Sequence, residues 1–232
     1  MEMTDITPDE VIYWQYDGIV KLNATIVFTW GLMAFMVIGS WVITRKLSTG
    51  IEMSRWQNIL EMIVEFARDQ IERITMRKPD RFLPFIATLF LFIAMSNILM
   101  IVPGFIPPTG SLSTTAALAI CVFIAVPAYG IAGQGLMGYL RNYVQPSVVM
   151  LPFNIIGELS RTLALAVRLF GNIMSGVKIG AILLAVIPII FPVVMHLLGL
   201  LTGLIQAYIF AILAMVYIAS GLRAQQHEDE EE

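Results

Sequence analysis

Apolar residues gather in five long runs that are separated by short polar or turn-forming segments. The runs lie at about 23–44, 82–102, 112–138, 152–187 and 191–221. About 20 apolar residues cross the hydrocarbon of a bilayer as a helix, so each run is long enough to span a membrane. The last two runs are longer than upright spans need, and Pro188 and Pro192 favour a turn between them. The pattern predicts an all-α polytopic membrane protein with about five membrane helices, the last two long and tilted.

A sixth segment, at about 54–76, shows a different pattern. Its apolar residues recur at helical spacing along one side: Trp56, Leu60, Ile63, Ala67, Ile71 and Ile74. Charged residues occupy the other side, where Asp69 and Arg73 are placed as an i,i+4 pair. The segment is too charged to span. We expect an amphipathic helix at the cytoplasmic membrane surface or one that packs on a partner helix, with a protruding soluble helix as the alternative.

Composition agrees with the membrane interpretation. Of the 232 residues, 58% are hydrophobic and 13% are charged, whereas about 25% of the residues in soluble domains are charged. We therefore expect a single membrane domain at 1–227, followed by an acidic tail at 228–232. Five of the 17 acidic residues lie in this tail, which leaves 12 against 14 basic residues. No basic run suggests nucleic acid binding, and Cys121, the single cysteine, cannot form an internal disulfide.

The distribution of basic residues predicts the orientation. Eight of the 14 basic residues lie between Arg45 and Arg81, and the positive-inside rule places such a segment in the cytoplasm. The N-terminus is then outside and the C-terminus is cytoplasmic. The first residues, MEMTDITPDEVIYW, are acidic and lack the basic start of a signal peptide. We expect the first apolar run to act as an uncleaved anchor.

Four charged residues interrupt the long apolar region at 142–222: Glu158, Arg161, Arg168 and Lys178. A charge at bilayer depth costs roughly 2.5–3.5 kcal/mol on insertion scales. Glu158 precedes Arg161 by three residues, so the two are expected to form a structural ion pair. Arg168 is left without a carboxylate in this region, and arginine stays protonated in essentially any protein environment. Its partner is expected on another protein; pairing with Glu158, or capping of a backbone carbonyl, is the alternative.

Several uncharged residues are candidates for the same site. Asn172 and Ser175 extend the helix face of Arg168, because they follow it by four and seven residues. Gln206, in the last run, either forms a helix–helix hydrogen bond or steadies the guanidinium of Arg168. His196 lies near the turn and is either an interfacial histidine or a proton relay.

Two residues in the middle runs have structural interpretations. Asn97 is a lone polar residue in the second run, and most such residues form helix–helix hydrogen bonds. Pro127 lies inside the third run, where it is expected to kink the helix.

Two motifs together indicate a family. RLFGN at 168–172 and the run IQAYIFA at 205–211 resemble subunit a of F-type ATP synthases. The resemblance implies a non-catalytic membrane stator, one copy per complex, in the cell inner membrane of a bacterium. Its partners would be the c-ring subunits, the peripheral-stalk b subunits and the lipid bilayer, with no cofactor. The translocated ion would be the proton, with sodium as the alternative. Arg168 matches the family's essential arginine, and Gln206 and Asn172 match its glutamine and asparagine.

The sequence departs from the family at one position. Many members carry a glutamate nine residues after the arginine, on the outer half-channel, whereas this chain has Val177 there and Lys178 next. Either Lys178 tunes the local pKa on this path or another residue serves in place of the glutamate. Lys178, Ser175 and His196 are candidates for ion translocation. The departure favours an unusual branch, such as the N-type ATPases. Two other functions stay open: a stand-alone cation/proton antiporter with Arg168 and Glu158 as a gated pair, and a non-transporting scaffold.

Overall fold

A computed structural model describes residues 12–16, 20–45, 55–76, 78–102, 104–144, 149–186 and 190–223. The acidic tail at 228–232 and Pro188 lie outside these residues, so the expectations for them stay predictions. The described chain is helical apart from one pair of short strands. The predicted all-α fold is therefore confirmed.

The strands β1 (Ile12–Tyr16) and β2 (Val20–Asn23) pair antiparallel directly before the first helix. The pattern of apolar runs did not predict this pair, because each strand is shorter than a membrane span. Asp17-Gly18 lies between the two strands in the sequence, and this dipeptide is a strong hairpin signal.

The described residues form six α-helices. Their bounds are α1 (Ala24–Thr44), α2 (Arg55–Thr75), α3 (Leu83–Leu99), α4 (Leu112–Val144), α5 (Met150–Val186) and α6 (Ile190–Arg223). Four of them, α1, α4, α5 and α6, are long and apolar enough to cross a membrane by length and composition. Helix α3 is apolar too, and its 17 residues are at the lower limit of a span.

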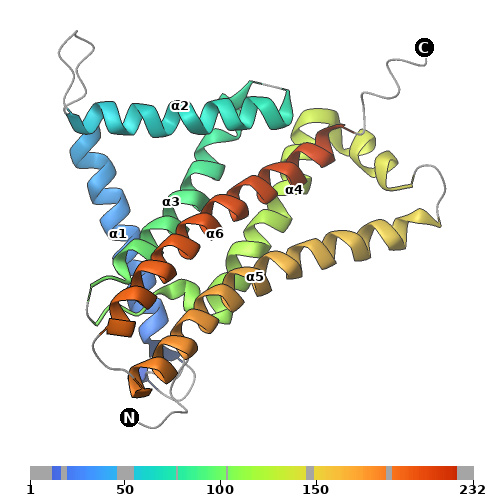
Figure 1. The fold of residues 1–232 in the computed structure, drawn as a ribbon. Helices are drawn as coiled ribbons and strands as arrows, with labels where there is room; N and C mark the ends of the chain where they lie inside the picture. Colours follow the sequence, from blue (N-terminus) through green and yellow to red (C-terminus); the bar gives the residue numbers. More distant parts are fainter. Residues whose placement is uncertain are drawn as a thin grey trace.

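Helices α3, α4, α5 and α6 pack around a common core, and α2 lies across one end of them (Figure 1). Core residues from α3, α5 and α6 are almost completely buried: Ile93, Leu165, Leu169, Phe210 and Ile218. Helices α5 and α6 run side by side as a hairpin, obliquely to α1 (Figure 1). We call the end of the bundle that carries α2 the α2 end, and the opposite end, where α5 passes into α6, the turn end.

Helix α1 is the most exposed of the apolar helices. Trp30 and Val37 on it are 65% and 68% exposed. Its apolar side chains lack a protein cover in this chain, and exposing so much apolar surface to water is unfavourable. The exposure of α1 therefore agrees with a helix that faces lipid.

Helix α4 breaks at Gly135. The sequence favoured a kink at Pro127, eight residues earlier. Gly135 has φ 78° and ψ 165°, whereas Pro127 keeps helical backbone angles. A proline inside a helix removes one hydrogen bond. A residue with a positive φ and an extended ψ, such as Gly135, leaves the helical path entirely. Such angles are essentially restricted to glycine, which is why the break lies at Gly135.

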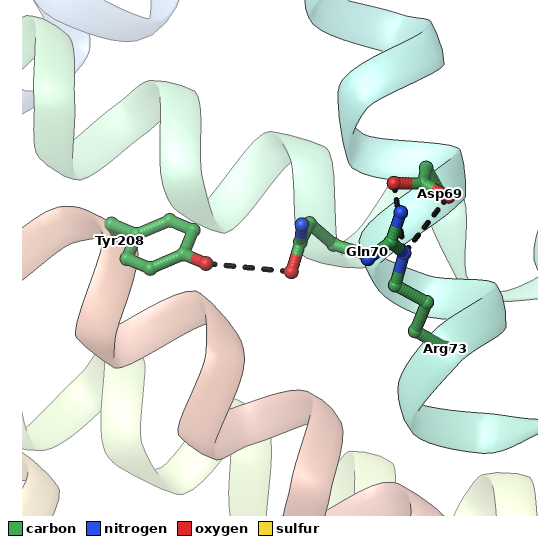
Figure 2. Close-up of polar contacts among 4 residues, drawn as sticks. All are labelled: Asp69, Gln70, Arg73 and Tyr208. Atoms are coloured by element: carbon green, nitrogen blue, oxygen red, sulfur yellow. Dashed lines mark hydrogen bonds and ion pairs between the residues drawn. The ribbon is translucent and has the colours of Figure 1, made fainter.

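The amphipathic helix α2 is tied to α6 by a polar and an aromatic contact. The hydroxyl of Tyr208 donates a hydrogen bond to Gln70 Oε1 at 3.4 Å, as Figure 2 shows. The rings of Phe66 and Tyr208 are 6.4 Å apart between centroids. On the polar side of α2, the predicted pair of Arg73 and Asp69 is present as a 3.0 Å ion pair (Figure 2).

We expect Tyr208→Phe to lower the stability of the protein only slightly. The variant loses one long hydrogen bond to Gln70, worth about 0.5–1.5 kcal/mol at most, and keeps the ring contact with Phe66. Tyr208→Ala loses both contacts and should lower the melting temperature of the solubilised complex clearly further. Equal melting temperatures for the two variants would contradict a role of the ring in fixing α2 on α6.

Candidate functional site

The register of the α5–α6 hairpin places the predicted site residues opposite one another. Asn172 Nδ2 on α5 donates a hydrogen bond to the Thr202 carbonyl oxygen on α6 at 3.4 Å. Because the two helices are antiparallel, one turn back along α5 corresponds to one turn forward along α6. Arg168 is therefore level with Gln206. The site forms where two segments far apart in the sequence meet near the middle of the hairpin.

Arg168 lies on an exposed, largely apolar face of α5. Ile179 and Ile182, which follow Arg168 by 11 and 14 residues and so share its side of the helix, are 48% and 65% exposed. The guanidinium of Arg168 forms no hydrogen bond or ion pair with any residue that the structure describes. A permanent positive charge thus stands without a counter-charge on a surface that would otherwise suit lipid or another apolar helix.

Gln206 is the buried polar residue of the site. It is 6% exposed, and its Nε2 finds no hydrogen-bond acceptor among the described residues. A buried donor without an acceptor costs about 1–3 kcal/mol, and most buried polar groups in native proteins are satisfied. The free donor therefore marks a place where another molecule, or water, completes the site.

The remaining candidates follow the hairpin toward the turn end. Ser175 Oγ donates to the Asn172 carbonyl oxygen at 3.1 Å, a local contact within α5. Lys178, ten residues after Arg168 on α5, is exposed. The antiparallel register that pairs Asn172 with Thr202 carries His196 level with Lys178. The register thus places Arg168, Asn172 and Gln206 within about one helical turn of one another along the hairpin, and Lys178 and His196 a few turns nearer the turn end.

Glu158 and Arg161 lie toward the α2 end, on the wall of a cavity of about 310 Å³ between α4, α5 and α6. The Arg161 guanidinium carbon is 5.8 Å from the centroid of the Tyr217 ring, a cation–π contact. The ion pair between Glu158 and Arg161 stays a prediction. Polar and charged residues lie beside apolar ones in the cavity wall, and the cavity is large enough for several water molecules.

A buried polar cluster joins α3 to α6 on the other side of the site. Asn97 Nδ2 donates to the Gly203 carbonyl oxygen at 2.8 Å, which confirms the helix–helix hydrogen bond predicted for Asn97. Thr109 Oγ1 is 3.2 Å from Ser96 Oγ and 3.5 Å from Asn97 Oδ1. Gly203 directly follows Thr202, so this cluster fixes α6 next to the contact that sets the hairpin register.

Comparison with known proteins identifies the family. The sequence profile described as "ATP synthase A chain" matches residues 26–219, most of the chain. The chain belongs to the ATP synthase A chain family. This confirms the resemblance drawn from RLFGN and IQAYIFA.

Relatives from several bacteria are similar over nearly their whole length. The chain is 61% identical over 225 residues to the ATP synthase subunit a of Albidiferax ferrireducens, covering 97% of both proteins. It is 61% identical to the ATP synthase subunit a 1 of Chlorobaculum parvum, over 95% of this chain and 97% of that protein. It is 60% identical to the ATP synthase subunit a 2 of Acaryochloris marina, over 96% and 94%.

Membership of the ATP synthase A chain family could be predicted from the sequence, but some contacts of the site could not. Tyr217 under Arg161 and the acceptor of Asn97 could not be assigned. The acceptor is a backbone carbonyl 106 residues away, and a carbonyl carries no side-chain signal. The small residue Gly203 was the available hint, since close helix contacts favour glycine.

Proposed function

We propose that the chain is the membrane stator subunit of a rotary F-type ATP synthase, and that Arg168 acts on carboxylates of a neighbouring ring of c subunits. The family membership supports the complex. The observation that carries the role of Arg168 is its position, unpaired among the described residues, on an exposed apolar face. An apolar ring of helices with one carboxylate each would cover that face and supply the missing counter-charge.

In the proposed mechanism Arg168 is a fixed positive charge that the ring carboxylates pass in turn. An ion from the outer side neutralises a carboxylate, which then rides through lipid for nearly a full turn. On return, Arg168 competes for the carboxylate and the ion leaves to the inner side. The membrane potential supplies roughly 2.3 kcal/mol per charge and 100 mV. Arg168 also repels cations, which is strongest at low dielectric, and so blocks a direct leak.

Two regions of the chain are proposed as the half-channels. The cavity of about 310 Å³ with Glu158 and Arg161 in its wall lies toward the α2 end and suits the inner path. The outer path would approach from the turn end, past Lys178 and His196. Lys178 is exposed, and it stands beside Val177, where many family members have a glutamate.

The proposal includes the setting of the subunit. The N-terminus is placed outside and α2 at the cytoplasmic surface of a bacterial cell membrane, because the segment between Arg45 and Arg81 is basic. Helices α1 and α2 would contact the peripheral-stalk b subunits. The chain would be non-catalytic, present once per complex and without a cofactor, with the proton as the ion and sodium as the alternative. Membership of the N-type branch is part of the proposal.

The test is ATP-driven ion uptake by the purified complex in liposomes, with and without sodium at fixed pH. Uptake of protons in the absence of sodium supports a proton-coupled stator, and uptake that requires sodium assigns sodium. A matched preparation holds this chain alone. Cation exchange by the chain alone would contradict the stator and favour the antiporter.

We expect Lys178→Ala to move the pH dependence of ATP synthesis. A cation beside the outer path disfavours proton binding at a nearby carboxylate, so its removal should shift the outer pH of half-maximal rate upward. The measurement is the rate of synthesis in liposomes at a series of outer pH values and a constant membrane potential. Lys178→Arg serves as the control, because it keeps the charge. An unchanged profile would leave Lys178 the role of extending to the membrane interface.

A further inference from the structure

The last part of α4 folds back onto the helix that precedes it. Gly130 and Tyr139 are nine residues apart, which is about 13.5 Å along a straight helix. A side chain at Gly130 would nevertheless place its Cβ 2.7 Å from Cδ2 and Cε2 of the Tyr139 ring. The ring therefore occupies the space beside Gly130, and it fits there because Gly130 has no side chain.

Two features produce and hold this fold-back. Gly135 supplies the break, with a φ of 78° and a ψ of 165° that other residues rarely adopt. Ala132 lies in the last turn before the break, where helix carbonyls lack intrahelical partners. Arg81, 51 residues earlier, donates a hydrogen bond from Nη2 to the Ala132 carbonyl oxygen at 3.3 Å. Arg81 thus caps the first part of α4 at the point where the chain turns.

The fold-back brings Tyr139 to the cavity toward the α2 end. Tyr139 is 7% exposed and lines the cavity of about 310 Å³ together with Glu158, Arg161 and Tyr217. A hypothetical Cβ at Gly130 would also lie 3.8 Å from the Gly221 carbonyl oxygen on α6. The ring of Tyr139 is therefore part of the cavity wall at the place where α4 approaches α6.

We propose that Tyr139 is a positioning residue that closes the wall of this cavity between α4 and α6, held in place by the break at Gly135 and the cap from Arg81. The inference rests on the proposed function in one respect, the use of the cavity as the inner ion path. Closure by Tyr139 limits how freely water and ions from the inner side reach Glu158, which is partly buried. The aromatic ring is the part of Tyr139 that fills the wall, so its hydroxyl is not required for closure.

The experiment measures access to the cavity with a thiol introduced by Thr162→Cys, because Thr162 is a partly buried residue of the lining. The native thiol is removed by Cys121→Ala. A small, positively charged, membrane-impermeant thiol reagent is applied to the inner side of membranes that contain the whole complex. We expect Tyr139→Ala to speed labelling several-fold, and Tyr139→Phe to leave it at the parental rate.

Gly130→Ala is the second variant, in case Tyr139→Ala prevents assembly. Its methyl group displaces the ring, so it should speed labelling in the same direction. Gly157→Ala is the matched control, because Gly157 lines the same cavity and has room for a methyl group. Labelling at the parental rate in the assembled Tyr139→Ala and Gly130→Ala complexes overturns the inference. Loss of ATP-driven uptake in Arg168→Ala, measured in parallel, tests the proposed function separately from it.

Discussion

Replacing Arg168 with alanine should reduce coupled ATP synthesis to background. The variant removes the charge that is proposed to displace the ion from the ring carboxylate and to block a leak between the half-channels. The shorter side chain leaves the apolar face of α5 intact, so the subunit should still assemble. ATP synthesis driven by an imposed ion gradient, and passive ion flow through membranes stripped of the soluble sector, are the two measurements.

Arg161→Ala is the matched control for this experiment. Arg161 is also exposed on α5 and lies seven residues before Arg168 on nearly the same face. Its contact is the Tyr217 ring, and its proposed place is the wall of the inner path. Arg161→Ala should therefore lower the rate and preserve coupling. Synthesis at the parental rate in Arg168→Ala membranes would refute the mechanism. Arg168→Lys should fall between, because lysine keeps the charge but lacks the planar fork.

Gly203→Val should destabilise the subunit strongly. A Cβ at Gly203 would lie 2.8 Å from Asn97 Cγ and 3.0 Å from Asn97 Cβ, too close to keep the present packing. Overpacking of this kind costs about 1–3 kcal/mol. Displacement of Asn97 also breaks its 2.8 Å hydrogen bond to the Gly203 carbonyl, and a buried group left unsatisfied costs about 1–3 kcal/mol more.

The measurements are the amount of the subunit in membranes and the melting temperature of the solubilised complex. Gly199→Val is the matched control, since Gly199 lies one turn earlier on α6 and has no atom close to its Cβ position. It should behave like the parent. Similar stability of the two valine variants would mean that the contact between Asn97 and Gly203 does not hold α6. Asn97→Ala combined with Gly203→Ala relieves the clash and should recover part of the loss.

The apolar runs predicted the helices well because the bilayer imposes one strong requirement. A membrane helix must be apolar over about 20 residues, and this requirement can be read along the chain. The first apolar run, for example, starts at about residue 23, and helix α1 begins at Ala24. The amphipathic spacing at 54–76 predicted α2 because one side of that helix packs on apolar surface.

Contacts between helices could be predicted only in part. The face shared by Arg168 and Asn172 followed from helical periodicity, but the register that brings Gln206 level with Arg168 depends on the hairpin turn. The fold-back at Gly135 was not predicted, because Pro127 is the stronger helix-breaking signal in the sequence. Glycine is common in membrane helices, so the sequence of a helix alone does not show which of its glycines leaves the helical path.

The bond between Asn97 and Gly203 also bears on how the chain is made. Helix α3 is synthesised well before α6, so the amide of Asn97 enters the bilayer before its acceptor exists. Until translation reaches α6, the amide of Asn97 on this 17-residue helix lacks the acceptor that it has in the folded subunit. Helix α6 therefore supplies the acceptor that a helix synthesised earlier requires. A nascent chain that stops before Gly203 would leave the Asn97 amide without this acceptor.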